Sequence, residues 1–251
     1  MLRTTALAFF IFLFFYVPAV QAQSGDKTVL DGVYSDAQSE RGHALYTAHC
    51  SACHGNALEG VSAPPLSGTR FIERWREGML GPLYDFIRER MPFGQPANSK
   101  RILDNEYLDI LTYVLKGNGY RTGESELTRS LLGNVMLVGM NGRQPVPDGA
   151  HIMTVGCLNK AGDDLWILSH ATEPARASTE NTSSPADLKT SSQKNLGTLT
   201  FRLSDLEAVP DFTPSAHDGH KMQAKGFLTR QPNAERISLS SMEMLDSSCK
   251  D

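Results

Sequence analysis

The chain has 251 residues, of which 40% are hydrophobic and 21% charged, and its formal net charge is -4. The length suits one large domain or two small ones, and the composition is ordinary for a soluble globular protein. Neither sign of charge dominates, so the composition gives a nucleic-acid partner no electrostatic support.

Residues 1–22 have the pattern of an export signal. Arg3 supplies the positive charge, residues 5–17 form an apolar run, and cleavage is expected after Ala22. The run is shorter than the ~20 residues that a membrane-spanning helix needs, so a membrane tether is expected only if the signal is not cleaved. We therefore expect a periplasmic or otherwise exported protein, in which thiols oxidise unless they are used.

Residues 23–121 are predicted to form an all-helical domain. Apolar residues recur at helical spacing in several short segments, and the loop over residues 55–69 is rich in glycine and proline. Asp36 or Ser39 is expected to cap the first helix and Asp104 the last. The expected helices cover residues 36–53, 70–79, 82–90 and 103–117.

The sequence "HCSACHG" places Cys50, Cys53 and His54 within five positions at the end of the first helix. Two thiols at this spacing, followed by an imidazole, are typical of a covalently attached haem c. Zinc requires four ligands, and no second Cys or His pair lies nearby. A thioredoxin-like motif requires a preceding strand, whereas this segment is helical. We therefore predict one covalent haem c, with His54 bound to its iron.

The second axial ligand of the iron is expected to be a methionine. Met91 lies in the Pro- and Gly-rich turn "ERMPFGQP", where its side chain can be aimed and held, and Met79 is its rival. Either residue could instead fill a gap in the core. His43 and His49 lie on the helix that precedes the haem motif and are expected to have surface or polar roles.

Residues 38–118 resemble a class I c-type cytochrome. The features occur in the family's order: Gly42 and Tyr46 on the first helix, C-x-x-C-H, the "PPL" loop, the Met-Pro turn and the last helix. The pattern "RMPFGQP" followed by "YLDILTYVLKGNG" is most similar to cytochromes associated with quinoprotein (PQQ-dependent) dehydrogenases.

This resemblance implies several roles. The first and last helices would cross at Gly42, against Ile110 and Tyr113. A carbonyl of Pro64 or Pro65 would orient the His54 ring through its other nitrogen. The haem would fill an otherwise thin core. The aromatic and aliphatic residues that we expect to wall the haem pocket are Phe71, Trp75, Phe86, Ile87 and Phe93.

Beyond residue 121 the pattern changes from helices to strands. Residues 122–150 are expected to be a linker and a first β segment, and residues 151–251 a small all-β domain similar to an OB-like barrel. The Ser/Thr-rich stretch 175–195 has almost no large apolar residues and is expected to be a mobile loop. The predicted fold class is therefore α+β in two domains.

The two remaining cysteines, Cys157 and Cys249, are predicted to form a disulfide that closes the β domain. His170, His217 and His220 match no common metal-site spacing and are expected to be scattered surface residues. The β strands carry no cluster of basic and aromatic residues, so we expect no nucleic-acid binding. A docking or interaction role is the expected function of this domain.

These features predict an exported monohaem electron carrier rather than an enzyme. With His54 and Met91 both on the iron, no coordination position is left for a substrate. The expected partners are redox proteins, with a dehydrogenase as donor and an oxidase as acceptor. Two alternatives stay open: a haem enzyme or a peroxide or gas sensor with an open sixth site, and a β-domain binding module with an accessory haem domain.

Overall fold

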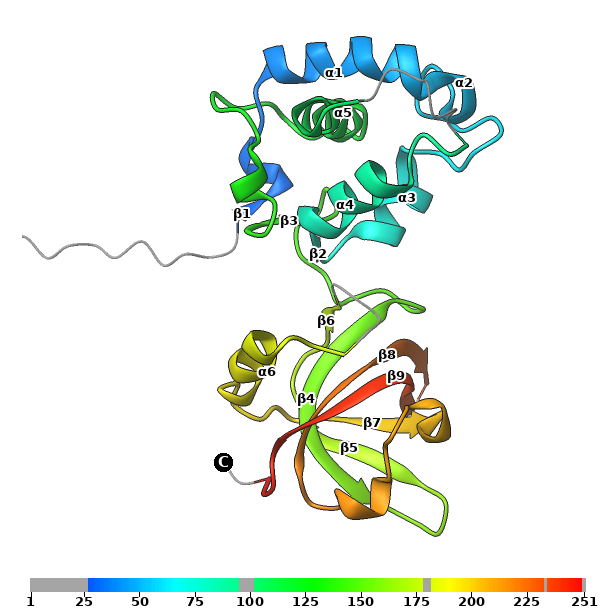
Figure 1. Ribbon diagram of the computed structural model, residues 1–251, viewed down its shortest axis with the longest axis vertical. Helices are drawn as coiled ribbons and strands as arrows, with labels where there is room; N and C mark the ends of the chain where they lie inside the picture. Colours follow the sequence, from blue (N-terminus) through cyan, green and yellow to red (C-terminus); the bar gives the residue numbers. More distant parts are fainter. Residues whose placement is uncertain (1–26, 95–101, 178–181, 233, 250–251) are drawn as a thin grey trace, which may run out of the picture.

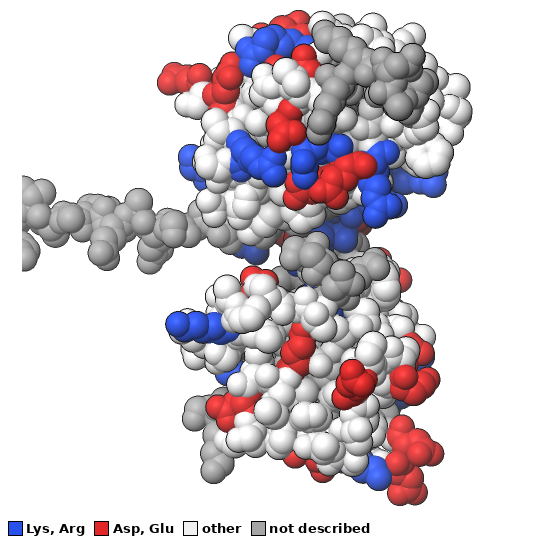
Figure 2. Space-filling view, in the orientation of Figure 1, with Lys and Arg blue, Asp and Glu red and all other residues white. Residues whose placement is uncertain are grey.

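A computed structural model describes residues 27–94, 102–177, 182–232 and 234–249, which form a helical domain and a β domain (Figure 1). The predicted export signal, residues 1–22, lies outside the described residues. Within the described ranges, no helix has the length and apolar character that a membrane crossing requires. Figure 2 shows basic and acidic side chains interspersed over one face of the helical domain.

The helical domain contains the four helices expected from the sequence and one short extra turn. The helices are α1 (Asp36–His49), α2 (Ser51–His54), α3 (Gly68–Trp75), α4 (Leu80–Arg90) and α5 (Asp104–Gly117). The Ser35 side chain, rather than Asp36 or Ser39, caps α1 by accepting from the Gln38 N–H. The expected helix over 70–79 ends early, because Glu77 has a left-handed backbone (φ 61°).

Helices α1 and α5 cross at Gly42, as the resemblance implies. Gly42 is buried, and a Cβ placed on it would lie 1.9 Å from the Asp109 carbonyl oxygen and 3.1 Å from the Ile110 nitrogen. Only glycine lets the two backbones approach this closely. The crossing therefore depends on the absence of one side chain.

The helical domain extends further along the chain than the sequence indicates. β3 (Val135–Leu137) lies between β1 (Lys27–Thr28) and β2 (Gly78–Met79) in a small sheet. The core of the helical domain includes the buried side chains from Leu127 to Val138. The predicted linker over 122–150 is thus wrong for its first half, because these apolar side chains are buried against the helices.

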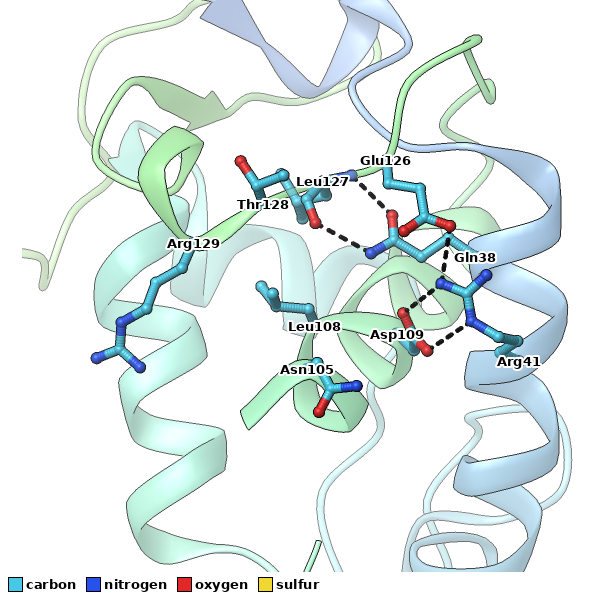
Figure 3. Close-up of a pocket in the computed structure, with 9 residues that line it drawn as sticks. All are labelled: Gln38, Arg41, Asn105, Leu108, Asp109, Glu126, Leu127, Thr128 and Arg129. Atoms are coloured by element: carbon cyan, nitrogen blue, oxygen red, sulfur yellow. Dashed lines mark hydrogen bonds and ion pairs between the residues drawn. The ribbon is translucent and has the colours of Figure 1, made fainter. Parts of the chain in front are cut away.

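Figure 3 shows the groove where the segment after α5 is tied to α1 and α5. The Gln38 amide donates to the Leu127 carbonyl (3.0 Å) and accepts from the Leu127 N–H (2.7 Å). The Arg41 guanidinium binds both carboxylate oxygens of Asp109, at 2.9 and 3.1 Å, and also pairs with Glu126 at 2.9 Å. The charges in this groove are therefore used to hold the chain in place.

The β domain contains a six-stranded sheet in the order β5-β7-β9-β8-β4-β6. Its β4 also pairs with β5, so the pairings β4–β5–β7–β9–β8–β4 close into a cycle. Strands β7 and β9 are parallel, and the other pairs are antiparallel. The strands are β4 (His151–Lys160), β5 (Trp166–Ala171), β6 (Ala175–Arg176), β7 (Leu199–Ser204), β8 (Lys221–Gln231) and β9 (Ala234–Asp246). The α+β class in two domains is confirmed.

The expected loop over 175–195 is wrong in part, since it contains β6 and a helix, α6 (Pro185–Ser192). A capping box starts this helix: the Ser184 side chain accepts from the Asp187 N–H, and the Asp187 side chain accepts from the Ser184 N–H. The proline at its first position has the φ that a helix requires. The capping box and the proline favour a helix here although the segment has almost no large apolar residues.

Polar contacts, rather than apolar ones, hold α6 on the sheet. The Ser191 hydroxyl donates to the buried Gln223 side chain of β8 at 2.5 Å. The Lys221 ammonium donates to the carbonyls of Ser192 (3.0 Å) and Lys194 (2.7 Å), which lie at the C-terminal end of the helix. A cation at this end also interacts favourably with the helix dipole.

Hydrogen bonds join the two domains directly. The Arg176 guanidinium of β6 donates to the backbone carbonyls of Arg76 (2.5 Å) and Glu73 (2.8 Å), where α3 ends. Arg76 in turn donates to the Pro145 carbonyl at 2.8 Å. Burial lowers the pKa of the Arg176 guanidinium, because the charged form loses hydration between the two domains. The β domain is therefore attached to the end of α3.

Replacing Gly42 by alanine is expected to destabilise the helical domain by about 1–3 kcal/mol, because the added methyl group overlaps the α5 backbone. Gly81→Ala is the matched control, since a Cβ there meets only the Leu132 carbonyl oxygen, at 3.8 Å. Urea unfolding of both variants measures the effect. Equal stability of the two variants would contradict the described crossing.

The structure joins Cys157 and Cys249 in a disulfide across 92 residues, with their Cα atoms 5.5 Å apart, as the sequence predicts. The chain-entropy model assigns such a loop about 4–5 kcal/mol of stabilisation. Alkylation of the denatured, unreduced protein should modify neither cysteine, and peptide mass mapping measures this. Modification of both would show that the thiols are free.

Candidate haem-binding site

The residues of the Cys-x-x-Cys-His motif lie on and just before a single turn of helix. Cys50 is both the C-cap of α1 and the N-cap of α2, so the chain changes direction at this residue. His54 ends α2 and is only 9% exposed, Cys50 is half-buried against the core, and Cys53 is exposed. One short turn thus presents two thiols beside one imidazole.

The His54 ring is oriented by a proline carbonyl. Its Nδ1 lies 2.8 Å from the Pro64 oxygen, which identifies Pro64 rather than Pro65 as the partner. A carbonyl can only accept, so Nδ1 carries the proton and Nε2 keeps its lone pair. The Pro64 carbonyl thus occupies Nδ1, and Nε2 is the nitrogen that could bind a metal.

The loop after α2 folds tightly enough to bring Pro64 back to the histidine. The Gly60 N–H donates to the His54 carbonyl at 2.7 Å. Gly60 has φ +79°, and a Cβ placed on it would lie 2.7 Å from both the Ala63 oxygen and the Pro65 nitrogen. A side chain at Gly60 would therefore displace the loop that positions the Pro64 carbonyl.

The tyrosine at position 46 fixes the other side of this loop. Its side chain is fully buried, and its hydroxyl donates to the Gly55 carbonyl at 2.5 Å, directly after the histidine. The ring is tilted against Tyr113 of α5 at a centroid distance of 5.0 Å, and His43 stacks on the same ring at 4.8 Å. His43 is thus exposed on α1 and packs on Tyr113 of α5.

The donor set fits a covalently bound haem better than a metal ion or a redox dithiol. Cys50 and Cys53 are not bonded to each other. Burial, with a smaller contribution from Cys53, raises the pKa of the Cys50 thiol to about 11, whereas reactive redox cysteines have lowered values. In the described part of the chain, no three His, Cys, Asp or Glu side chains converge as a metal site would require.

The two candidate methionines differ in their surroundings. Met79 lies in β2, paired with Met136, and packs against the core of the helical domain. Met91 is half-buried directly after α4, and its carbonyl accepts a hydrogen bond from the Tyr107 hydroxyl at 2.7 Å. Tyr107 therefore ties the methionine turn to α5.

Tyr107 is a residue near the site that the sequence analysis does not single out. Its phenol is the signal that could have been used, because a largely buried tyrosine hydroxyl usually finds a hydrogen-bond partner. A second group was also missed: the Arg88 Nε on α4 is buried and lacks a hydrogen-bond partner among the described residues. An acidic group of a bound cofactor would satisfy such a donor.

The residues expected to wall the haem pocket differ in how far they are buried. Phe71 is buried, and Ile87 and Trp75 pack against the core. Trp75 is tilted against Phe86 at 5.6 Å between ring centroids. Phe93, by contrast, is 92% exposed and lies outside the core. It follows Met91 closely and precedes residues 95–101, which are not described.

Residues 37–114 match the family model of cytochrome c oxidase, cbb3-type, subunit III. The match spans the haem motif, the proline loop, Met91 and most of α5. It supports a c-type cytochrome over this region, and thus a domain of the haem-binding, electron-transfer class. Searches of curated proteins and of solved structures gave no match to the chain.

Proposed function

We propose that this protein is an exported monohaem c-type cytochrome that carries one electron at a time between redox proteins. The observation that carries the proposal is the His54 ring, whose Nδ1 is held by Pro64 while the thiols of Cys50 and Cys53 stand beside it unbonded. Bound haem would supply a one-electron iron couple at this position.

Each residue of the site has a distinct part in this function. Cys50 and Cys53 would hold the cofactor covalently as thioethers, so that its retention does not depend on the axial ligands alone. His54 would bind the iron through Nε2, and the Pro64 carbonyl would fix its ring and raise its basicity. The buried aromatic residues around α3 would exclude water from the site.

We assign the second axial position to Met91. Met79 already packs in the core as one side chain of the β2–β3 pair, whereas Met91 is held by its backbone and is outside that core set. A thioether ligand favours the ferrous state and raises the reduction potential. With both axial positions filled by the protein, the site suits electron transfer and leaves no position for a substrate.

The proposed redox partners are inferred from the matching family and from the sequence resemblance. The description of the matching family supports a respiratory oxidase as electron acceptor. The likeness of the Met91 turn and the last helix to quinoprotein-associated cytochromes supports a PQQ-dependent dehydrogenase as donor. The pattern of residues 1–22 supports export to the periplasm, with a membrane tether only if this segment is retained.

The β domain is proposed to be an OB-like barrel with a docking role. The closed cycle of strand pairings and the parallel β7–β9 pair support the barrel. The contacts of Arg176 with the end of α3 support a role in docking, because a partner bound to the β domain would lie at a fixed position relative to the haem domain.

The choice of axial methionine is tested with two matched variants. The oxidised protein should show the weak far-red absorption band of a thioether sulfur bound to ferric haem. Met91→Leu should abolish this band and lower the reduction potential, because leucine keeps the volume but lacks the sulfur. Met79→Leu should leave both unchanged, and visible spectroscopy with redox titration measures the two effects.

The opposite pattern, with the band lost only in Met79→Leu, would place the ligand on β2. High-spin iron without this band in the unmodified protein would favour the alternative function, a haem enzyme or sensor with an open sixth site. Full binding of a partner by a variant that lacks the haem would instead favour the β domain as a separate binding module.

A further inference from the structure

The structure brings together two histidines that the sequence analysis treated as scattered surface residues. His217 and His220 lie in the turn between the 3-10 helix Pro214–Ala216 and β8, and both are half-buried. Their Nδ1 atoms are 3.3 Å apart, with ring centroids 5.4 Å apart and ring planes at 78°. His170 lies on β5, where its Nδ1 contacts the Ser169 hydroxyl instead.

The separation of the two nitrogens fits one tetrahedral metal ion. With Zn–N bonds of about 2.0–2.1 Å and a tetrahedral angle, two ligating nitrogens lie roughly 3.4 Å apart. The observed 3.3 Å lies close to this separation. The same separation also permits a hydrogen bond in which one ring donates to the other, so the test must distinguish the two.

The turn that carries both imidazoles is fixed by backbone hydrogen bonds. The His217 N–H donates to the Pro214 carbonyl (3.0 Å), and the His220 N–H donates to the His217 carbonyl (3.1 Å). Leu158 of β4 holds the turn from the other side: it accepts from the Gly219 N–H at 2.8 Å and donates to the His220 carbonyl at 3.1 Å. The backbone of the turn that carries the two histidines is therefore held by the sheet.

Side-chain contacts and the disulfide restrict the turn further. Phe212 stacks on the His217 ring at 5.5 Å between centroids and 11° between planes. The Asp218 carboxylate accepts from the Lys160 N–H of β4 at 3.1 Å. The Cys249 N–H donates to the Gly219 carbonyl at 3.0 Å, so the Cys157–Cys249 disulfide also fixes this turn. Such pre-organisation lowers the entropic cost of binding a ligand.

We propose that His217 and His220 bind a zinc ion through their Nδ1 atoms. No third His, Cys, Asp or Glu joins the pair in the described residues. Structural zinc sites have four protein ligands, whereas this one leaves positions for water or for a ligand from outside the chain. The site is thus open and exchangeable, and it is independent of the haem site and of the proposed electron transfer.

The test is a calorimetric titration of zinc chloride into the full-length, haem-loaded, disulfide-oxidised protein without an affinity tag. The unmodified protein should bind one equivalent of zinc. His217→Phe, which keeps the stack on Phe212, and His220→Ala should each lose this equivalent. His170→Ala is the control and should bind as the unmodified protein does. Thermal melting confirms that each variant is folded.

A second measurement does not depend on the variants. Nitrogen-15 NMR of the histidine rings should show the Nδ1 signals of both residues shifting when zinc is added. The proposal would be overturned if the unmodified protein binds no zinc, or if both variants bind it fully. It would also be overturned if the Nδ1 signals stay unchanged with zinc, since the two rings then form only a hydrogen bond.

Discussion

The hydrogen bond between His54 Nδ1 and the Pro64 carbonyl is the contact on which the proposed function of the helical domain depends. It decides which imidazole nitrogen has a free lone pair, and it exists only because the following loop turns back through Gly55 and Gly60. Tyr46 anchors the start of that loop on α1. This 2.8 Å contact thus depends on α1 and on the two glycine turns, and it leaves Nε2 of His54 free to bind a metal.

The rest of the molecule keeps this arrangement rigid. The close approach at Gly42 sets the position of α1, which carries the motif, against α5, which carries Tyr107 and so positions the Met91 turn. The chain after α5 returns to the same two helices through Leu127. The β domain is in turn fixed to the end of α3 by Arg176. His54 and Met91, the proposed axial ligands, are therefore both positioned by hydrogen bonds within the helical domain.

Much of this could be predicted from the sequence where a local pattern decides the structure. The apolar periodicity of α5 and the C-x-x-C-H spacing each depend on a few neighbouring residues, whereas the crossing of Gly42 with α5 is implied by the family resemblance. The sequence-based predictions fail where contacts between residues far apart in the chain determine the structure. Residues 127–138 become core because they meet helices far away in the chain. Helix α6 forms on a polar face because Gln223 accepts a hydrogen bond from Ser191 and Lys221 donates one to the Ser192 carbonyl. The meeting of His217 and His220 likewise depends on a turn held by β4.

The most direct test of the haem assignment is the intact mass of the exported, purified protein, measured after denaturation. A red protein whose mass exceeds that of the processed polypeptide by one haem, with Cys50 and Cys53 both resistant to alkylation, is the expected result. A colourless protein with the mass of the bare polypeptide and two reactive thiols would contradict it.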